Sequence, residues 1–228
     1  MAQDPLPPVP PNAYVRHGEG LEFGRVVFFT DAVFAIALTL LVVDIGIPTL
    51  RGPAGDSSTM LDALSDTLPE VISFFIAFIV IGRYWLAHHL FFGQLRAVDR
   101  PLISLNLLYL AFVAFLPWPT ALVGDYEQNP ISVLLLATCL AIISGLEVVQ
   151  FHYAYKHNLM RQRIPPDVYR FGVFGSLTPV AVFILSAPLA FVSSTLCLTS
   201  WLVTIPIGII LDRRGPRGAR QFMLGARG

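Results

Sequence analysis

The chain has 228 residues, of which 55% are hydrophobic and 13% charged, with a mean hydropathy of +0.67 and a formal net charge of +0. Soluble domains carry roughly 25% charged residues, so this composition excludes an ordinary soluble domain and indicates a polytopic membrane protein. The balanced charge argues against binding of nucleic acid. Both cysteines lie in apolar runs, without the spacing of a metal site or of a disulfide framework.

The first 23 residues are rich in proline and precede the apolar part of the chain. They lack the basic start and apolar core of a cleavable signal peptide. Proline-rich segments favour extended conformations. We therefore expect residues 1–23 to form an extended or disordered tail.

Six apolar segments follow, each close to the roughly 20 residues that a membrane-spanning helix needs. The predicted spans are Gly24–Ile47, Leu68–Phe91, Leu102–Val123, Ile131–Tyr155, Phe171–Val192 and Ser194–Leu211. The predicted fold class is an all-α integral membrane protein with a six-transmembrane-helix domain over residues 24–211 and no soluble domain. Residues 51–67 are expected to be a connection, Pro117 and Pro119 to mark the outer end of the third helix, and residues 212–228 to be a basic tail.

Positive charge predicts the orientation of the bundle. With six crossings, nearly all lysines and arginines fall on the side of the two termini, and the opposite side holds only Arg51 among five acidic residues. The positive-inside rule then places both termini in the cytoplasm. Six helices are too few to enclose a wide axial pore, so any pore is expected to be formed by a symmetric oligomer.

The first span carries an ionisable residue, Asp31, near its start. A charged residue inside a membrane is costly and is a functional hypothesis by default. At about 100° per residue, Asp31 lies about 140° from Ile36. The face centred on Ile36 also carries Phe29, Thr39, Leu40 and Val43. Two alternatives follow: this face contacts lipid, which the residues alone favour, or it lines a symmetric pore whose apolar constrictions gate conduction by dewetting.

Polar side chains also lie in the second, third and fourth spans. Trp85 is three residues from His88 and four from His89, so on a helix it faces both. Together with Asn106 of the third span, these residues are candidates for one hydrogen-bond network with Asp31 at similar depth. Two adjacent histidines suggest a metal only weakly, because a metal site needs further ligands, and no metal or cofactor is expected. In the fourth span, Glu147 is either a structural buried acid or a proton relay.

These residues are similar to a known family. RVVFFTDAVFAIALTLLVVDI resembles the motif of the transmembrane protein 175 family, which has an Arg, three residues and then Phe-Ser-Asp. Here the motif is Arg25, Phe29, Thr30 and Asp31, with Thr30 keeping the hydroxyl of the serine but being stiffer at χ1. WLAHH in the second span, and Asn106 and LPWPT in the third, also resemble bacterial members. The last three spans match the family only in hydropathy and loop charge.

The resemblance implies a potassium-permeable channel of the bacterial inner membrane, assembled as a homotetramer, with the first helix lining the pore. It implies that Ile36 forms the narrowest apolar ring, that Leu40 and Val43 form further constrictions, and that Thr39 forms a hydroxyl layer for selectivity. An apolar ring offers no oxygen to replace hydration water, so a modest preference for K⁺ over Na⁺ is expected. The network holding the pore helix is assigned to Arg25, Phe29, Thr30, Asp31, Trp85, His88, His89 and Asn106.

Two other functions stay open at the level of sequence. A proton-coupled transporter or proton leak would use Glu147 and Asp31, and its flux would depend on pH. A small membrane enzyme would use His88 and His89 with a bound metal. The sequence contains no TVGYG-like filter loop, phosphate-binding loop or nucleophile elbow. We therefore expect a channel and not an enzyme.

Overall fold

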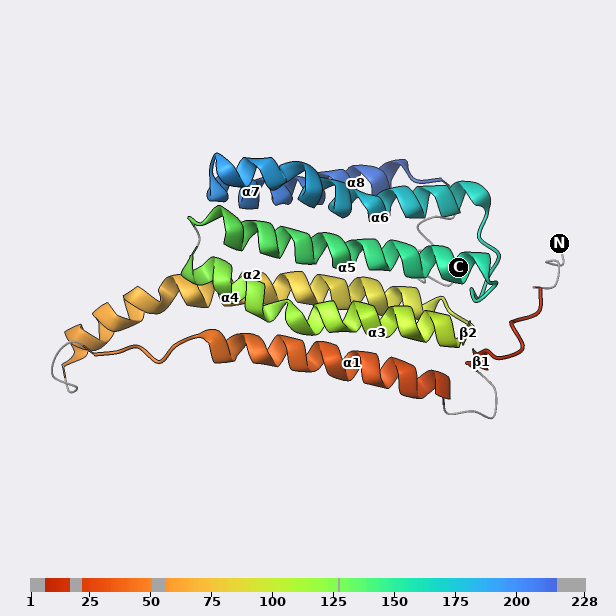
Figure 1. Cartoon of the computed structure of the whole chain (residues 1–228), viewed down its shortest axis with the longest axis horizontal. Coiled ribbons are helices and arrows are strands. Elements are labelled where there is room, and N and C mark those ends of the chain that lie inside the picture. The colour runs from red at the N-terminus through yellow and green to blue at the C-terminus, as the bar shows by residue number, and fades with distance from the viewer. Residues whose placement is uncertain (1–6, 17–21, 51–55, 127, 217–228) are drawn as a thin grey trace.

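The computed structural model describes residues 7–16, 22–50, 56–126 and 128–216. Six helical segments in this part of the chain are long and apolar enough to cross a membrane. They lie side by side in an elongated bundle (Figure 1), with no separate soluble domain among the described residues. This confirms the predicted fold class and the number of spans.

Two of the first three spans combine a helix with a shorter second one. The first span consists of α1 (Glu22–Leu40) followed by the 3₁₀ helix η1 (Leu41–Asp44), the second of α2 (Ser57–Gly93), and the third of α3 (Arg100–Phe115) with α4 (Pro117–Asp125). The first helical segment therefore stops short of Ile47, the predicted end of the first span.

The last three spans show the same pattern of long helices with short irregular turns. They consist of α5 (Pro130–Lys156), then α6 (Pro166–Ser186) with η2 (Ala187–Phe191), and then α7 (Ser194–Ser200), η3 (Trp201–Val203) and α8 (Thr204–Arg214). Only Val192 and Ser193 separate the fifth and sixth spans, as expected for a tight helical hairpin.

The start of α2 corrects the sequence prediction, because residues 57–67 are helical and not a connection. Asp56 caps this end: its carboxylate accepts bonds from the Ser58 hydroxyl at 2.7 Å and the Ser58 N–H at 3.1 Å. These two bonds lower the pKa of the Asp56 carboxyl. At 1.5 Å per residue, the 37 residues of α2 extend about 55 Å, so the first turns project beyond the bundle (Figure 1).

Pro117 and Pro119 break the third span but do not end it, which corrects a second expectation. α3 stops at Phe115, and α4 starts at Pro117 and continues to Asp125. Proline is well suited to the first turn of a helix, where its missing N–H has no partner to lose. The two prolines therefore start a new helix within the same span.

The N-terminal segment is also more ordered than expected. β1 (Tyr14–Val15) pairs in an antiparallel manner with β2 (Ala97–Val98), which lies between α2 and α3. Residues 1–6 and 17–21 of the predicted tail lie outside the described residues, as do residues 217–228 of the predicted basic tail. We call the end of the bundle that carries this strand pair the β1 end.

Two apolar clusters fill the interior and fix the position of α1. The larger cluster lies between α1, α2, α3 and α5, and its fully buried members include Phe34, Ile81, Val113 and Ile143. A second cluster at the β1 end surrounds Phe23, Leu95 and Leu102. Burying such side chains stabilises a close-packed interior, and polar residues interrupt the packing between the two clusters.

Candidate functional site on the first helix

α1 has one buried face and one bare face. The buried residues are Phe23, Thr30, Phe34 and Ala37, which are spaced three, four or seven apart and so share a face. On the opposite face, Ile36 is 57% and Leu40 47% exposed in the single chain, and Val43, in the following η1, is 73% exposed. These are the side chains predicted to form constrictions. Thr39 is exposed beside them.

Three polar side chains from three helices form a continuous chain behind the bare face. The Asn106 amide of α3 donates to the Thr30 hydroxyl oxygen at 2.9 Å, and the Thr30 hydroxyl donates to the carbonyl of Val26 at 2.9 Å. His88 Nε2 of α2 lies 2.8 Å from Asn106 Oδ1. Thr30, His88 and Asn106 are all at most 4% exposed.

The hydrogen bonds determine which atoms of Thr30, Asn106 and His88 donate and which accept. Since the Asn106 nitrogen donates to Thr30, its oxygen must accept, and His88 Nε2 must carry the proton. The imidazole stacks between Phe92 at 4.2 Å and Tyr109 at 5.1 Å between ring centroids. His88 is therefore the histidine that bonds the polar residues behind α1, a choice that the sequence leaves open.

Asp31 belongs to a second, separate contact. Its Oδ1 accepts a 2.9 Å bond from the indole N–H of Trp85, and the Trp85 ring stacks on His89 at 5.2 Å. The expectation that Trp85 faces both histidines is wrong, because His88 turns inward to Asn106 while His89 stays on the side of Trp85. The predicted single network is thus two sets of contacts. The first joins α1 to α3 and, through Asn106, to α2, and the second joins α1 directly to α2.

Arg25 and Phe29 lie apart from these contacts. The Arg25 guanidinium lies 3.4 Å from the carboxylate of Glu22, and the two side chains are 74% and 49% exposed. Phe29 is 51% exposed. Both residues lie about 20° from Ile36 around the helix, on the bare side of α1. The hydrogen bonds of Thr30, Asn106 and His88 therefore involve neither of them.

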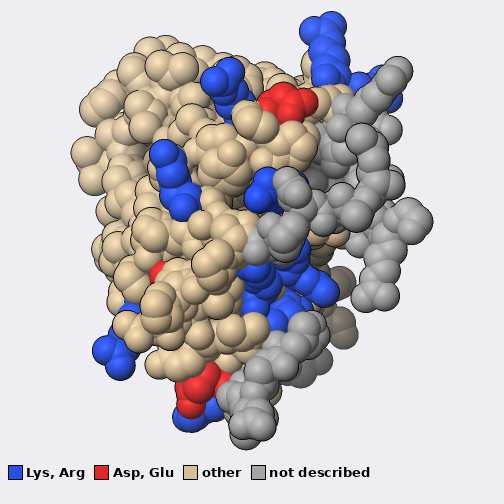
Figure 2. Space-filling model, turned by 90° about the vertical axis from the view of Figure 1, so that its right-hand side faces the viewer, with Lys and Arg blue, Asp and Glu red and all other residues tan. Residues whose placement is uncertain are grey.

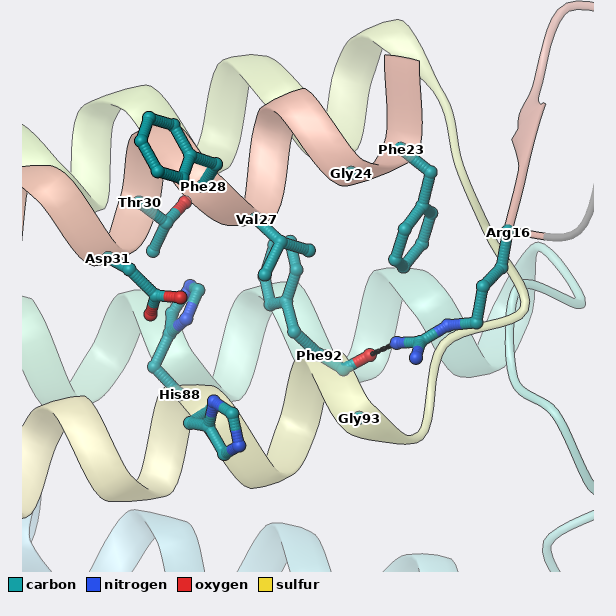
Figure 3. Close-up of a pocket in the computed structure, with 11 residues that line it drawn as sticks. Arg16, Phe23, Gly24, Val27, Phe28, Thr30, Asp31, His88, Phe92 and Gly93 are labelled. Carbon is teal, nitrogen blue, oxygen red and sulfur yellow. Dashed lines mark hydrogen bonds between the residues drawn. The ribbon is translucent and has the colours of Figure 1, made fainter. Parts of the chain in front are cut away.

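A pocket of about 500 Å³ opens beside Asp31, between α1 and the last turns of α2. Asp31, His88 and Thr30 lie at its inner end, aromatic side chains such as Phe28 and Phe92 line its walls, and Arg16 lies at the other end (Figure 3). The contacts that pin α1 are thus open on one side to a hollow of the size of a small-molecule site.

Thr39 has a defined hydroxyl orientation. Its Oγ1 donates a 2.9 Å bond to the carbonyl of Ile36, three residues earlier on the same helix. The proton is then used within the helix, and the oxygen lone pairs stay free to accept. The exposed side of α1 consequently presents one layer of oxygen acceptors between apolar side chains.

Glu147 occupies a polar cluster deeper in the bundle. The Tyr109 hydroxyl donates to its Oε1 at 3.0 Å, and on the adjacent turn Tyr84 lies 2.8 Å from the hydroxyl of Ser144. Tyr109 also stacks on His88. Glu147 is therefore linked through Tyr109 to His88, whereas Asp31 belongs to the separate contact with Trp85.

Sequence reasoning missed two contributors to the site, Tyr109 and Phe92. Each is buried and flanks His88. Tyr109 lies three residues after Asn106, on the same helical face, and this spacing is the signal that could have found it. Phe92 has no such signal, since an aromatic residue in an apolar run is an ordinary core residue.

The fold and this site define a six-span integral membrane protein of the channel class. The chain belongs to the TMEM175 family: residues 25–117 match the family model described as "Endosomal/lysosomal potassium channel TMEM175". A potassium channel of Chamaesiphon minutus is 31% identical over 150 residues, covering 66% of this chain and 72% of that protein. The family consists of channels, so the expectation that the chain is not an enzyme is confirmed.

Other relatives are matched over less of their length. A potassium channel of Streptomyces collinus is 38% identical over 136 residues, and this chain covers 64% of it. The human relative, an endosomal/lysosomal proton channel, is 35% identical over 116 residues, with 49% of this chain and 23% of that protein covered. The family model matches the first two spans and most of the third, the part of the chain that carries the sequence motif.

Solved structures agree with the fold. The crystal structure of a lysosomal potassium-selective channel TMEM175 homologue from Chamaesiphon minutus superposes with a TM-score of 0.66 at 25% identity, covering 86% of this chain and 98% of that chain. A variant of the potassium channel MtTMEM175, solved with a nanobody–MBP fusion, superposes with a TM-score of 0.62 at 19% identity and supports the fold alone.

Proposed function

We propose that this chain is one subunit of a homotetrameric potassium channel, in which four copies of α1 surround the pore. One observation carries the proposal: α1 is pinned by polar bonds on one face, while the opposite face, with Ile36, Leu40 and Val43, is bare. The bare apolar face contacts either lipid or other copies of the chain, and the family match over this helix favours other copies around a pore. The names of the Streptomyces and Chamaesiphon relatives support potassium as the permeating ion.

In the proposed assembly, the four Ile36 side chains form the narrowest ring, and Leu40 and Val43 form further constrictions. A ring of branched apolar side chains closes a pore by expelling water from it. Thr39 contributes four hydroxyl oxygens next to this ring, and their lone pairs face the ion because the protons are bound to the Ile36 carbonyls. The proposed selectivity is a modest preference for K⁺ over Na⁺.

The proposed location is the bacterial inner membrane, with both termini in the cytoplasm. The β1 end carries exposed Arg100, Lys156, Arg163 and Arg170, and the opposite end carries the acidic first turns of α2. The positive-inside rule then assigns the β1 end to the cytoplasm.

The experiment is ion flux from liposomes containing the purified chain, with K⁺ and Na⁺ gradients compared. Ile36→Asn should wet the constriction and raise potassium flux. Ile184→Asn is the matched control, because Ile184 lies on α6 and is 59% exposed, against 57% for Ile36. Equal effects of the two substitutions, or no effect of Ile36→Asn, would place α1 against lipid and reject the pore.

A second candidate function is proton conduction, with Glu147 and Asp31 as carriers. It is favoured by the bond between Tyr109 and Glu147 and by the name of the animal relatives, which are proton channels. Glu147→Gln keeps an oxygen acceptor for Tyr109 and removes the exchangeable carboxyl proton. Loss of proton flux in this variant, with potassium flux intact, would establish the second function, and unchanged proton flux would exclude Glu147 from it.

A further inference from the structure

Three arginines lie at the β1 end of the bundle, near the last turn of α2: Arg16 and Arg161 bond the adjacent carbonyls of Phe92 and Gly93, and Arg96 lies on the adjoining turn. The N–H of Arg16 donates to the carbonyl of Arg96 at 2.8 Å, next to the paired strands β1 and β2. The N–H of Arg161 donates to the carbonyl of Gln94 at 2.8 Å, beside a bridge between Leu95 and Met160. Segments far apart in sequence are thereby fixed side by side.

Backbone carbonyls hold all three guanidinium groups in place. Arg16 donates to Phe92 at 2.6 Å and to Leu95 at 3.0 Å, and its guanidinium carbon lies 4.6 Å from the centroid of the Phe23 ring. Figure 3 shows this side chain against the end of α2. Arg161 donates to the carbonyl of Gly93 at 3.4 Å.

Arg96 is held in the same way by the turn that follows α5. Its Nε and Nη2 donate to the carbonyl of Asn158 at 3.0 and 2.8 Å, and Nη2 also donates to Pro7. Asn158 has a positive φ of 56°, a conformation that asparagine tolerates better than most residues. The tight turn thus aims its carbonyl at the guanidinium.

These arginines retain donors that no group within residues 7–16, 22–50, 56–126 and 128–216 uses. A guanidinium carries five N–H donors, and the bonds above use two of Arg16, three of Arg96 and one of Arg161. Arg16 and Arg96 are partly buried. Because these two side chains are already ordered, a ligand that binds them loses less of its binding free energy to freezing their rotamers.

The charge of this cluster is not compensated within the described residues. The one ion pair there joins Arg25 to Glu22, and no carboxylate lies within 4 Å of Arg16, Arg96 or Arg161. The pKa of Arg16 is lowered by partial burial and then by the positive charge of Arg161. Lys and Arg side chains gather over this end of the bundle, with acidic side chains toward its edges (Figure 2).

We propose that Arg16 and Arg161, with Arg96 on the adjoining turn, form a binding site for a phosphate group at the β1 end, beside the start of α1. A phosphate offers several oxygen acceptors, which match the planar fork of a guanidinium and neutralise the repulsion between Arg16 and Arg161. The phosphate belongs to a lipid headgroup or to a soluble phosphorylated ligand. A ligand bound here contacts Arg16, whose guanidinium packs on the ring of Phe23 in the first turn of α1.

The test uses the full chain with two probes, which distinguish the two sources. Inorganic pyrophosphate is titrated into protein in uncharged detergent, and phosphatidic acid is added to nanodiscs of phosphatidylcholine. Binding is followed by calorimetry for the first probe and by the rise in Tm for the second. Neither readout depends on ion conduction, so the result is independent of the proposed channel function.

Arg161→Gln is the informative variant, because Arg161 makes one long side-chain bond and its loss leaves the strand pair intact. Arg163→Gln removes the same charge from an exposed residue of the same loop and serves as the control. We expect at least one probe to bind, about tenfold more weakly to Arg161→Gln, the equivalent of about 1.4 kcal/mol, and unchanged to Arg163→Gln. Binding of neither probe, or equal weakening in both variants, would overturn the site.

Discussion

On the buried face of α1, Thr30 is 2% exposed and bonds Asn106, whereas on the opposite face Ile36 is 57% exposed among other apolar side chains. Both faces belong to one helix of 19 residues. The difference teaches that hydrophobicity alone does not tell an anchored face from a bare one in a membrane, where lipid solvates apolar side chains well. The polar contacts distinguish the two faces and fix the direction in which each one points.

Breaking the anchored face should have the largest effect. Asn106→Ala removes the donor to Thr30 and the acceptor of His88, leaving a buried N–H without a partner, and should lower the free energy of unfolding by about 2 to 3 kcal/mol. Thermal unfolding of the purified protein in detergent measures this loss.

Ser104→Ala is the matched control for Asn106→Ala. Ser104 lies on the same helix, is exposed and bonds only the carbonyl of Arg100 in its own helix. A change of Tm no larger for Asn106→Ala than for Ser104→Ala would show that the hydrogen bonds linking Thr30, Asn106 and His88 do not hold α1 in place.

Changes at Asp31 should have a smaller effect, because one bond to Trp85 is at stake. Asp31→Ala should cost about 1 kcal/mol, the worth of a hydrogen bond between helices in a membrane. It should impair assembly and gating more than ion preference. Size-exclusion chromatography and liposome flux measure the two consequences.

Asp31→Asn separates the hydrogen bond from the charge. The amide keeps an oxygen that accepts from the Trp85 indole and lacks the negative charge. Assembly and flux close to those of the unmodified chain are expected. Damage equal to that of Asp31→Ala would show that the charge facing the pocket, and not the bond, is what Asp31 supplies.

Changes on the bare face that leave it apolar should be the mildest for stability. Thr39→Ala removes the layer of hydroxyl oxygens and should lower the preference for K⁺ over Na⁺ by about twofold, equivalent to about 0.4 kcal/mol. Thr39→Ser keeps the hydroxyl and should preserve the preference. Reversal potentials in paired K⁺ and Na⁺ solutions measure both, and an unchanged ratio in Thr39→Ala would remove Thr39 from selectivity.

The number of spans and the approximate position of each could be predicted, because runs of apolar residues and the charge of the connecting segments carry that information. The first turns of α2 could not, because Asp62 and Asp66 make residues 57–67 as polar as a loop. Their helical structure depends on the cap at Asp56, a local bond that hydropathy does not register.

The candidate site could be predicted in part. The spacing within α1 separates Asp31 from Ile36 correctly, because it depends only on helical geometry. The partners on other helices depend on how α1, α2 and α3 rotate against one another. Spacing along one helix therefore could not decide between His88 and His89, nor show that Arg25 bonds Glu22 and stays outside the network.

The most direct test of the pore is the accessibility of α1 to water. Cys139 and Cys197 are both buried, so a charged, water-soluble thiol reagent should report mainly on an introduced cysteine. The reagent should block potassium flux through Ile36→Cys and leave Ile184→Cys, on the exposed side of α6, conducting. Unblocked flux through Ile36→Cys, or equal block of both variants, would contradict a pore lined by the first helix.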